Sequence, residues 1–128
     1  MPVAFAALAP YDGQRRHMKI ERRIEDGIAV LVLEGEFDSF ETNLVDKHFT
    51  ACLEEGHNKI VLDCEKLSFV NSTTIAYFIK AQKTARSQGG EVIFARPRDF
   101  IRKTLDTLGL GQVFRMSDSP DAAIAELK

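Results

Sequence analysis

The 128-residue sequence lacks the marks of several large classes of protein. Its formal net charge is only −2, and without a basic excess neither DNA nor RNA is an expected partner. It has two cysteines, Cys52 and Cys64, with no histidine at metal-ligand spacing to either, so we predict reduced thiols and no metal site. The three histidines show no paired spacing, and we assign them no role.

Motifs that mark common enzymes are also missing. There is no G-x-x-x-x-G-K phosphate loop, no G-x-G-x-x-G turn and no G-x-S-x-G nucleophile elbow. Asp38 and Asp63 lie near predicted strand ends and could approach Ser72, but no histidine or lysine is placed to activate that hydroxyl. We therefore predict no catalytic residue, no cofactor and no enzymatic activity.

The first ten residues, Met1–Pro10, are apolar but too short to cross a membrane, and they lack the basic start of a secretory signal. Neither membrane insertion nor secretion is expected, which predicts a cytoplasmic protein. Because the next seven residues are polar, we expect residues 1–17 to form a flexible extension and residues 18–128 to form one domain. The regular pattern begins at Met18, which is a candidate translation start.

The residues that are present indicate an α/β domain. The sequence is 45% hydrophobic and 28% charged, as is ordinary for a globular protein. Residues 18–24 alternate imperfectly, an Asp26-Gly27 turn follows, and residues 28–33 are apolar at every position. This pattern predicts an antiparallel hairpin whose second strand is buried on both faces.

Helical and strand patterns then alternate to the end of the chain. Asp38 with Glu41 is typical of a capping box that opens a helix, and Gly56 is placed to end it. Further strands are predicted at 59–63 and 91–95, with a loop at 64–70 after the first and a short extended piece at Val113-Phe114. Further helices are predicted from Asn71 to about Ser87, from Pro97 to Gly109, and from Ser119 onward. Leu108 is expected to face inward. This order predicts a mixed sheet, antiparallel at its N-terminal hairpin and largely parallel elsewhere, with about four helices packed on it.

Three hydroxyl residues follow Asn71, where a buried strand gives way to a helix. Side chains at such a position cap the helix by accepting from its first backbone N–H groups. The same N–H groups and the helix macrodipole also favour a phosphate. From the residues alone, Asn71 is predicted to be the cap, while a phosphate-bearing site and a nucleotide or small-molecule site both stay open.

Five segments taken together resemble the STAS domain of bacterial anti-sigma-factor antagonists. They are Gly35–Asp38, Ile60–Asp63, Leu67–Thr74, Gly89–Glu91 and Thr107–Leu110. The resemblance covers about residues 18–127. It implies a single domain with helices packed on a mixed sheet, in agreement with the predicted order of elements.

The resemblance also implies a regulator that switches partners. The unmodified protein is expected to bind a kinase-type anti-sigma factor and thereby free a sigma factor; phosphorylation releases it, and a phosphatase restores binding. The serine that matches the family's target is Ser72, with Thr73 and Thr74 as alternative acceptors. Asn71 stands where the family usually has aspartate, and Thr74 where it usually has glycine.

The family match further implies a partner-binding surface. Its expected residues are Gly35, Glu36, Phe37, Asp38, Asn71, Thr73 and Thr74. The departures at Asn71 and Thr74 favour an alternative, in which the protein is a non-phosphorylated STAS interaction module such as a scaffold or the accessory subunit of a lipid-transport ATPase. The partner and the oligomeric state are left open.

Overall fold

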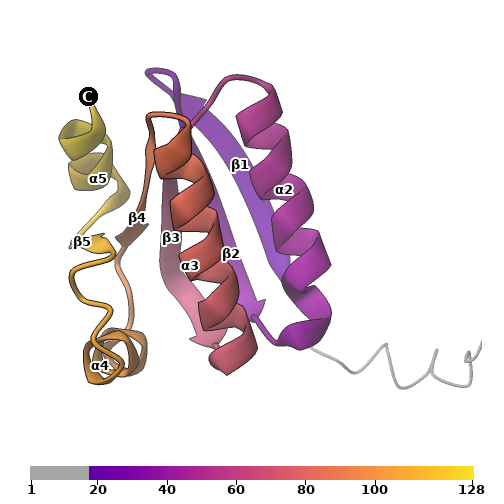
Figure 1. Ribbon diagram of the computed structural model, residues 1–128, viewed down its shortest axis with the longest axis vertical. Coiled ribbons are helices and arrows are strands. Elements are labelled where there is room, and N and C mark those ends of the chain that lie inside the picture. Colours follow the sequence, from indigo (N-terminus) through magenta and orange to yellow (C-terminus); the bar gives the residue numbers. More distant parts are fainter. Residues whose placement is uncertain (1–17) are drawn as a thin grey trace, which may run out of the picture.

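The computed structural model of the protein describes residues 18–128, which form a five-stranded mixed sheet flanked by helices (Figure 1). The elements are β1 (Lys19–Glu25), β2 (Ile28–Glu36), the 3-10 turn η1 (Ser39–Glu41), α2 (Thr42–Glu54), β3 (Lys59–Phe69), α3 (Ser72–Ser87), β4 (Glu91–Ala95), α4 (Asp99–Thr107), β5 (Arg115–Ser117) and α5 (Pro120–Leu127). The strands lie in sequence order, with β1 antiparallel to β2 and the other pairs parallel. The predicted fold class is confirmed, whereas the predicted extension, residues 1–17, lies outside the described residues.

The N-terminal hairpin turns at Asp26 and Gly27, as predicted. Both residues have left-handed backbone conformations, with φ of 55° and 78°. Two consecutive positive φ angles define the tight turn whose twist matches that of the flanking strands, and Asp-Gly favours it. Glu25 and Ile28 are therefore paired directly across the turn.

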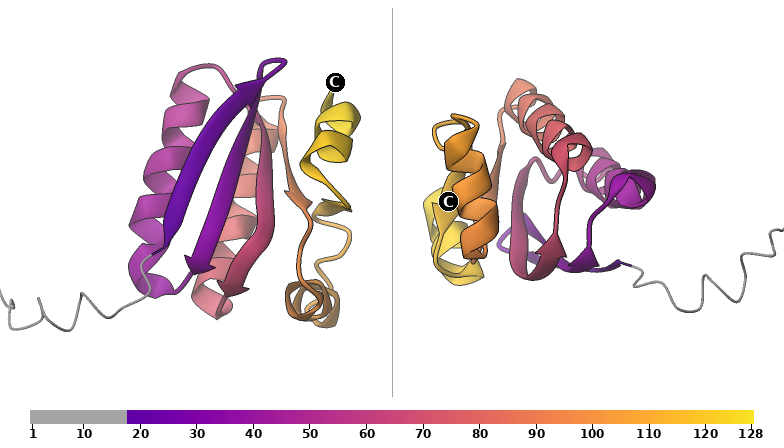
Figure 2. Two further views of the ribbon diagram at one scale, coloured as in Figure 1. Left: turned by 180° about the vertical axis from the view of Figure 1, so that it is seen from behind. Right: turned by 90° about the horizontal axis from the view of Figure 1, so that it is seen from below.

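Strand β2 is buried on both faces because helices cover the two sides of the sheet. Leu31 and Leu33 belong to the large core beneath α2, α3 and α4, whereas Ile28 and Val30 pack with Ile124 of α5. Figure 2 shows α2 and α3 together on one side of the sheet, with α5 on the other. The uninterrupted apolar run of β2 thus marks a strand buried on both faces, as predicted.

The start of α2 differs from the prediction. Asp38 caps the 3-10 turn η1, its carboxylate accepting from the Phe40 N–H at 2.9 Å, and α2 begins only at Thr42 with no side-chain cap. The rest of the helix follows the pattern, since its buried side chains include Val45 and Phe49. Gly56 ends it in a left-handed conformation, with φ of 90°.

Strand β3 is longer than expected, and the predicted loop at 64–70 was wrong. The strand continues to Phe69 because β2 also extends beyond Leu33 and keeps pairing with it, Gly35 with Leu67 and Glu36 with Phe69. Two register shifts interrupt this pairing. Such bulges break the simple alternation from which a strand is recognised in a sequence, which explains the error.

Three details near α4 also differ. Pro97 does not lie in the first turn: Arg98 is the N-cap, and its carbonyl accepts from Ile101 and Arg102. Leu108 does not face inward, for it is 56% exposed. Gly109 reverses the chain after it, so that Leu110, whose N–H donates to the Leu105 carbonyl at 2.8 Å, packs against the core instead.

The predicted extended piece at Val113-Phe114 precedes the observed strand, since β5 covers Arg115–Ser117. Phe114 is instead a core residue, stacked on Phe94 with ring centroids 4.8 Å apart. The final helix starts after Ser119 as expected, its hydroxyl accepting from the Ala122 N–H at 3.0 Å.

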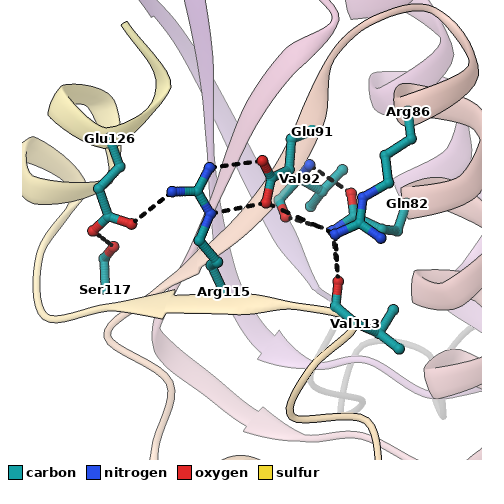
Figure 3. Close-up of polar contacts among 8 residues, drawn as sticks. All are labelled: Gln82, Arg86, Glu91, Val92, Val113, Arg115, Ser117 and Glu126. Carbon is teal, nitrogen blue, oxygen red and sulfur yellow. Dashed lines mark hydrogen bonds and ion pairs between the residues drawn. The ribbon is translucent and has the colours of Figure 1, made fainter.

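The β4 edge of the sheet is completed by a buried glutamine (Figure 3). The Gln82 side chain accepts from the Val92 N–H at 2.7 Å and donates to the carbonyls of Val92 and Val113, each at 3.0 Å. Strand β5 pairs with β4 only from Ile93 onward, where Arg115 is its partner. The side-chain amide of Gln82 therefore takes the place of a β5 partner for Val92, which is also paired with Ile60 of β3.

Charged side chains join the same edge to α5 (Figure 3). Arg115 holds the Glu91 carboxylate through two hydrogen bonds of 2.7 and 3.0 Å and lies 3.4 Å from Glu126, which accepts from the Ser117 hydroxyl at 2.6 Å. The hydrogen bonds from Arg115 hold the pKa of Glu91 below its usual range. Arg86 of α3 lies 3.9 Å from the same carboxylate.

Candidate functional site

The start of α3 lies at the end of the sheet where the parallel strands β2 and β3 finish, beside η1 (Figure 1). Two contacts join these segments: the Phe37 N–H donates to the Phe69 carbonyl at 2.9 Å, and Nδ2 of Asn71 lies 3.4 Å from Oγ of Ser39. Because parallel strands present their carboxyl ends at one edge, the loops that follow them meet there. The structure thus brings the predicted segments 35–38 and 71–74 together.

A reciprocal capping box fixes the start of α3. The Asn71 side-chain oxygen accepts from the Thr74 N–H at 3.0 Å, and the Thr74 hydroxyl accepts from the Asn71 N–H at 2.9 Å while donating to the Asn71 carbonyl at 3.0 Å. The predicted cap at Asn71 is confirmed. Threonine here plays the part that glutamate or glutamine usually plays at the third helical position.

The three hydroxyl residues after Asn71 have different surroundings. Ser72 and Thr73 are exposed, whereas Thr74 is fully buried. The Thr74 hydroxyl already donates one hydrogen bond and accepts another within the capping box. Modification of Thr74 would have to break that box, so the geometry favours Ser72 and Thr73 as acceptors.

The segment Gly35–Asp38 contains both surface and core positions. Glu36 is exposed, and Gly35 has a φ of 106°, a conformation that favours glycine. Phe37, in contrast, is fully buried and meets the rings of Tyr77 and Phe78 edge to face, with centroids 6.2 and 5.2 Å away. Phe37 therefore cannot touch a partner, and the expectation that it does is corrected: it anchors the segment to α3.

Two exposed phenylalanines at this end of the molecule did not figure in the sequence prediction. Phe40 in η1 is 77% exposed, and Phe69 at the end of β3 is 42% exposed. Phe40 precedes Leu44 by four residues, so helical spacing alone places it on the buried stripe of α2. Its exposure follows from the 3-10 turn, which the sequence pattern does not reveal.

The second carboxylate considered for chemistry, Asp63, is engaged in a structural ion pair. It is 3% exposed, and Arg96 binds both of its oxygens at 2.7 and 3.1 Å. The hydrogen bond to Asp63 raises the pKa of Arg96. Across residues 18–128 no group of three or more His, Cys, Asp or Glu side chains could hold a metal ion.

A groove of about 480 Å³ lies between α2 and α3. Its walls include Phe49, Leu53 and Tyr77, and the Tyr77 hydroxyl donates to Asp46 at 3.0 Å. Burial, followed by the Asp46 charge, raises the pKa of Tyr77, which keeps the phenol neutral. The groove therefore combines apolar side chains with polar ones such as Thr50 and Lys80, and its tyrosine is not an activated nucleophile.

Comparison with known proteins places the domain in a family. Residues 19–123 match the family model described as the STAS domain. A similar curated protein is BtrV of Bordetella bronchiseptica, provisionally named an anti-sigma factor antagonist; it is 23% identical over 111 residues, which cover 87% of this chain and 96% of BtrV. In the described part of the chain, no helix combines the length and apolar character needed to span a membrane.

Two solved structures have the same fold. A provisionally named anti-sigma factor antagonist from Thermotoga maritima has a TM-score of 0.75 at 22% identity, covering 84% of this chain and 93% of its own. The Bacillus cell fate determinant SpoIIAA, solved in its phosphorylated form, has a TM-score of 0.67 at 20% identity, covering 88% and 100% respectively.

Proposed function

The chain belongs to the STAS domain family, and we propose that it is an anti-sigma factor antagonist whose partner binding is controlled by phosphorylation of Ser72. The observation that carries the proposal is the exposed Ser72 hydroxyl directly after the Asn71 cap, at the edge where the segments after β2 and β3 meet. Relatives named as antagonists, and the phosphorylated form of SpoIIAA, support it. The proposed role is protein binding and not catalysis.

The surface that would contact the partner is formed by Gly35, Glu36, Asp38, Phe40, Phe69, Asn71, Ser72 and Thr73, and is called here the docking surface. Its exposed phenylalanines offer the large apolar contacts that anchor protein interfaces. Phe37 and Thr74 are not part of this surface, because both are buried; each holds in place the segment that carries the exposed residues.

The expected partner is a kinase-type anti-sigma factor, which binds the unmodified protein and phosphorylates Ser72. A phosphatase would return the protein to its binding form. Because sigma factors act on transcription, the proposed place of action is the cytoplasm.

Magnitudes favour a local switch over a change of fold. A phosphate carries about −1.5 to −2 charges, and a helix N-terminus stabilises an exposed anion by only about 0.3–1 kcal/mol. Burying that charge beside an unsuitable group at an interface costs several kcal/mol. A loss of about 2–4 kcal/mol weakens binding roughly thirty- to several-hundredfold, so the fold persists while the partner leaves.

The decisive experiment uses the candidate anti-sigma kinase from the same cells. Wild-type protein, Ser72→Ala and the control Ser87→Ala, an exposed serine at the other end of α3, are incubated with the kinase and ATP. We expect wild type and the control to be phosphorylated at Ser72. Binding to the kinase, measured by calorimetry without ATP, should be retained in unmodified Ser72→Ala and reduced at least thirtyfold in the phosphorylated wild type.

Two results would contradict the proposal. Wild-type protein that binds the kinase but is never phosphorylated would remove the switch, and phosphate on Thr73 in both wild type and Ser72→Ala would move it by one residue. A non-phosphorylated interaction module is the second candidate, favoured by the neutral Asn71 and the closed capping box. Recovery of a transport ATPase or a sensor scaffold in place of a kinase would support that candidate.

A further inference from the structure

Ser39 is a second exposed serine at the same edge of the sheet as Ser72. It lies in the connection between β2 and α2, and its Oγ is 3.4 Å from Nδ2 of Asn71, the residue that directly precedes Ser72. Although Ser39 and Asn71 are 32 residues apart in the chain, their side chains are in contact, which brings Ser39 to the residue next to Ser72.

The orientation of the Asn71 amide follows from its hydrogen bonds. The Thr74 N–H is a donor, so the oxygen of the Asn71 side chain must face it, at 3.0 Å. The NH₂ group then faces Ser39, because the two ends of the amide point apart. Ser39 therefore has a neutral hydrogen-bond donor beside its hydroxyl, where a carboxylate at position 71 would present a negative oxygen.

The backbone around the two serines is also similar. Ser39 follows Asp38 and Ser72 follows Asn71, and both preceding residues have extended backbones with ψ of −176° and −177°. In each case the preceding side chain accepts from a backbone N–H farther along the chain, which holds the segment in place. Both serines are thus presented to solvent from fixed segments.

We propose that Ser39 is a second phosphoacceptor, modified by the same kinase-type partner that acts on Ser72; the inference therefore rests on the proposed function. Oγ of Ser39 attacks the γ-phosphorus of ATP held by the kinase, the bond from that phosphorus to the bridging oxygen breaks, and ADP leaves. The hydroxyl proton passes to the catalytic base of the kinase. Because Ser39 lies between Asp38 and Phe40 of the docking surface, no second docking face is required.

A phosphate on Ser39 would gain a donor from Asn71 and would add a second negative group to the docking surface. Phosphate oxygens form strong charge-assisted hydrogen bonds with N–H donors. The doubly phosphorylated protein is therefore expected to bind its partner more weakly than the singly phosphorylated one, since each added charge faces the same interface.

The test is made on the full chain, tagged and produced in its native cells, and analysed by intact mass and phosphopeptide mapping. The variants are Ser39→Ala, Ser72→Ala, the double variant and the control Ser87→Ala. We expect up to two phosphates in wild type and in the control, one in each single variant, and none in the double variant. Phosphate at Ser39 in Ser72→Ala supports the inference directly.

The outcomes separate this inference from the proposed function. If Ser72 is phosphorylated while Ser39 stays unmodified in wild type and in Ser72→Ala, the inference is wrong and the proposed function stands. If neither serine carries phosphate, both are overturned.

A further variant, Asn71→Asp, tests the donor facing Ser39. Asparagine and aspartate cap helices about equally well, so the start of α3 should survive the change. The carboxylate would repel a phosphate on Ser39, and we expect phosphorylation of Ser39 to fall about tenfold relative to that of Ser72. An unchanged ratio of the two phosphates would overturn the part assigned to the Asn71 amide.

Discussion

Two polar side chains of α3, Thr74 and Gln82, are almost completely buried, with exposures of 0% and 1%, yet they are satisfied in different ways. Thr74 bonds only to the peptide groups of Asn71, three residues before it. Gln82 bonds to Val92 and Val113, which are ten and thirty-one residues away. One end of the helix is therefore closed by its own neighbours, whereas the middle of the helix is tied to the far edge of the sheet.

The difference indicates how one helix can serve two purposes. Because the capping box is local, a change of charge at the exposed Ser72 or Thr73 would leave the distant contacts of the helix in place. Gln82 cannot change without disturbing distant contacts, because its side chain binds the Val92 N–H of β4 at a position where β5 does not yet pair with β4. The proposed docking surface and the structural support thus occupy separate turns of the same helix.

Replacing Gln82 with leucine tests this contrast most strongly. Leucine has a suitable size, but the Val92 N–H and carbonyl would lose the side-chain amide inside the protein, and each unsatisfied buried group costs about 1–3 kcal/mol. We expect the free energy of unfolding, measured in urea, to fall by about 2–4 kcal/mol. The exposed Gln88→Ala is the control and should change it by less than about 0.5 kcal/mol. A fall of less than about 1 kcal/mol for Gln82→Leu would show that the β4 edge does not depend on the amide.

Thr74→Val and Thr73→Val form a matched pair at the other end of α3. The first change keeps the shape of a buried side chain but removes both hydroxyl bonds to Asn71, and we expect a loss of about 1–2 kcal/mol. The second affects an exposed hydroxyl and should stay within about 0.5 kcal/mol. Equal effects of the two substitutions on urea unfolding would contradict the part assigned to the Thr74 hydroxyl in the capping box.

Breaking the ion pair between Arg115 and Glu91 should lower the free energy of unfolding least of the three changes, and the loss should depend on pH. Arg115 lowers the pKa of folded Glu91, so the pair stabilises the protein above the ordinary glutamate pKa, and this contribution is lost as the pH falls through the lowered value. At neutral pH we expect Glu91→Gln to cost about 0.5–1 kcal/mol, because Arg115 is half exposed.

Urea unfolding over a series of pH values measures this dependence. The difference between wild type and Glu91→Gln should shrink as the solution becomes more acidic, and Arg115→Gln should show the same trend. A difference that stays constant with pH would assign the loss to packing and not to charge.

The parts of the fold that could be predicted rest on local chemistry. The Asp26-Gly27 turn, the glycine stop at Gly56 and the cap at Asn71 each depend on residues within a few positions of one another. The docking surface was predictable only in part. Ser72 was predicted to be a surface residue and is exposed. Phe37 was also assigned to the surface but lies in the core, because the sequence alone does not show whether an aromatic side chain points into the protein or out of it.

The sequence by itself determined where strands and helices alternate, because the periods of apolar residues and the turn residues are written locally in the chain. Only the tertiary structure decided that Ser39 lies beside Asn71 and that Gln82 completes the edge of β4. It also decided that Phe40 and Leu108 are exposed. Contacts between distant segments depend on strand register and helix placement, which bulges and 3-10 turns alter without changing the local pattern.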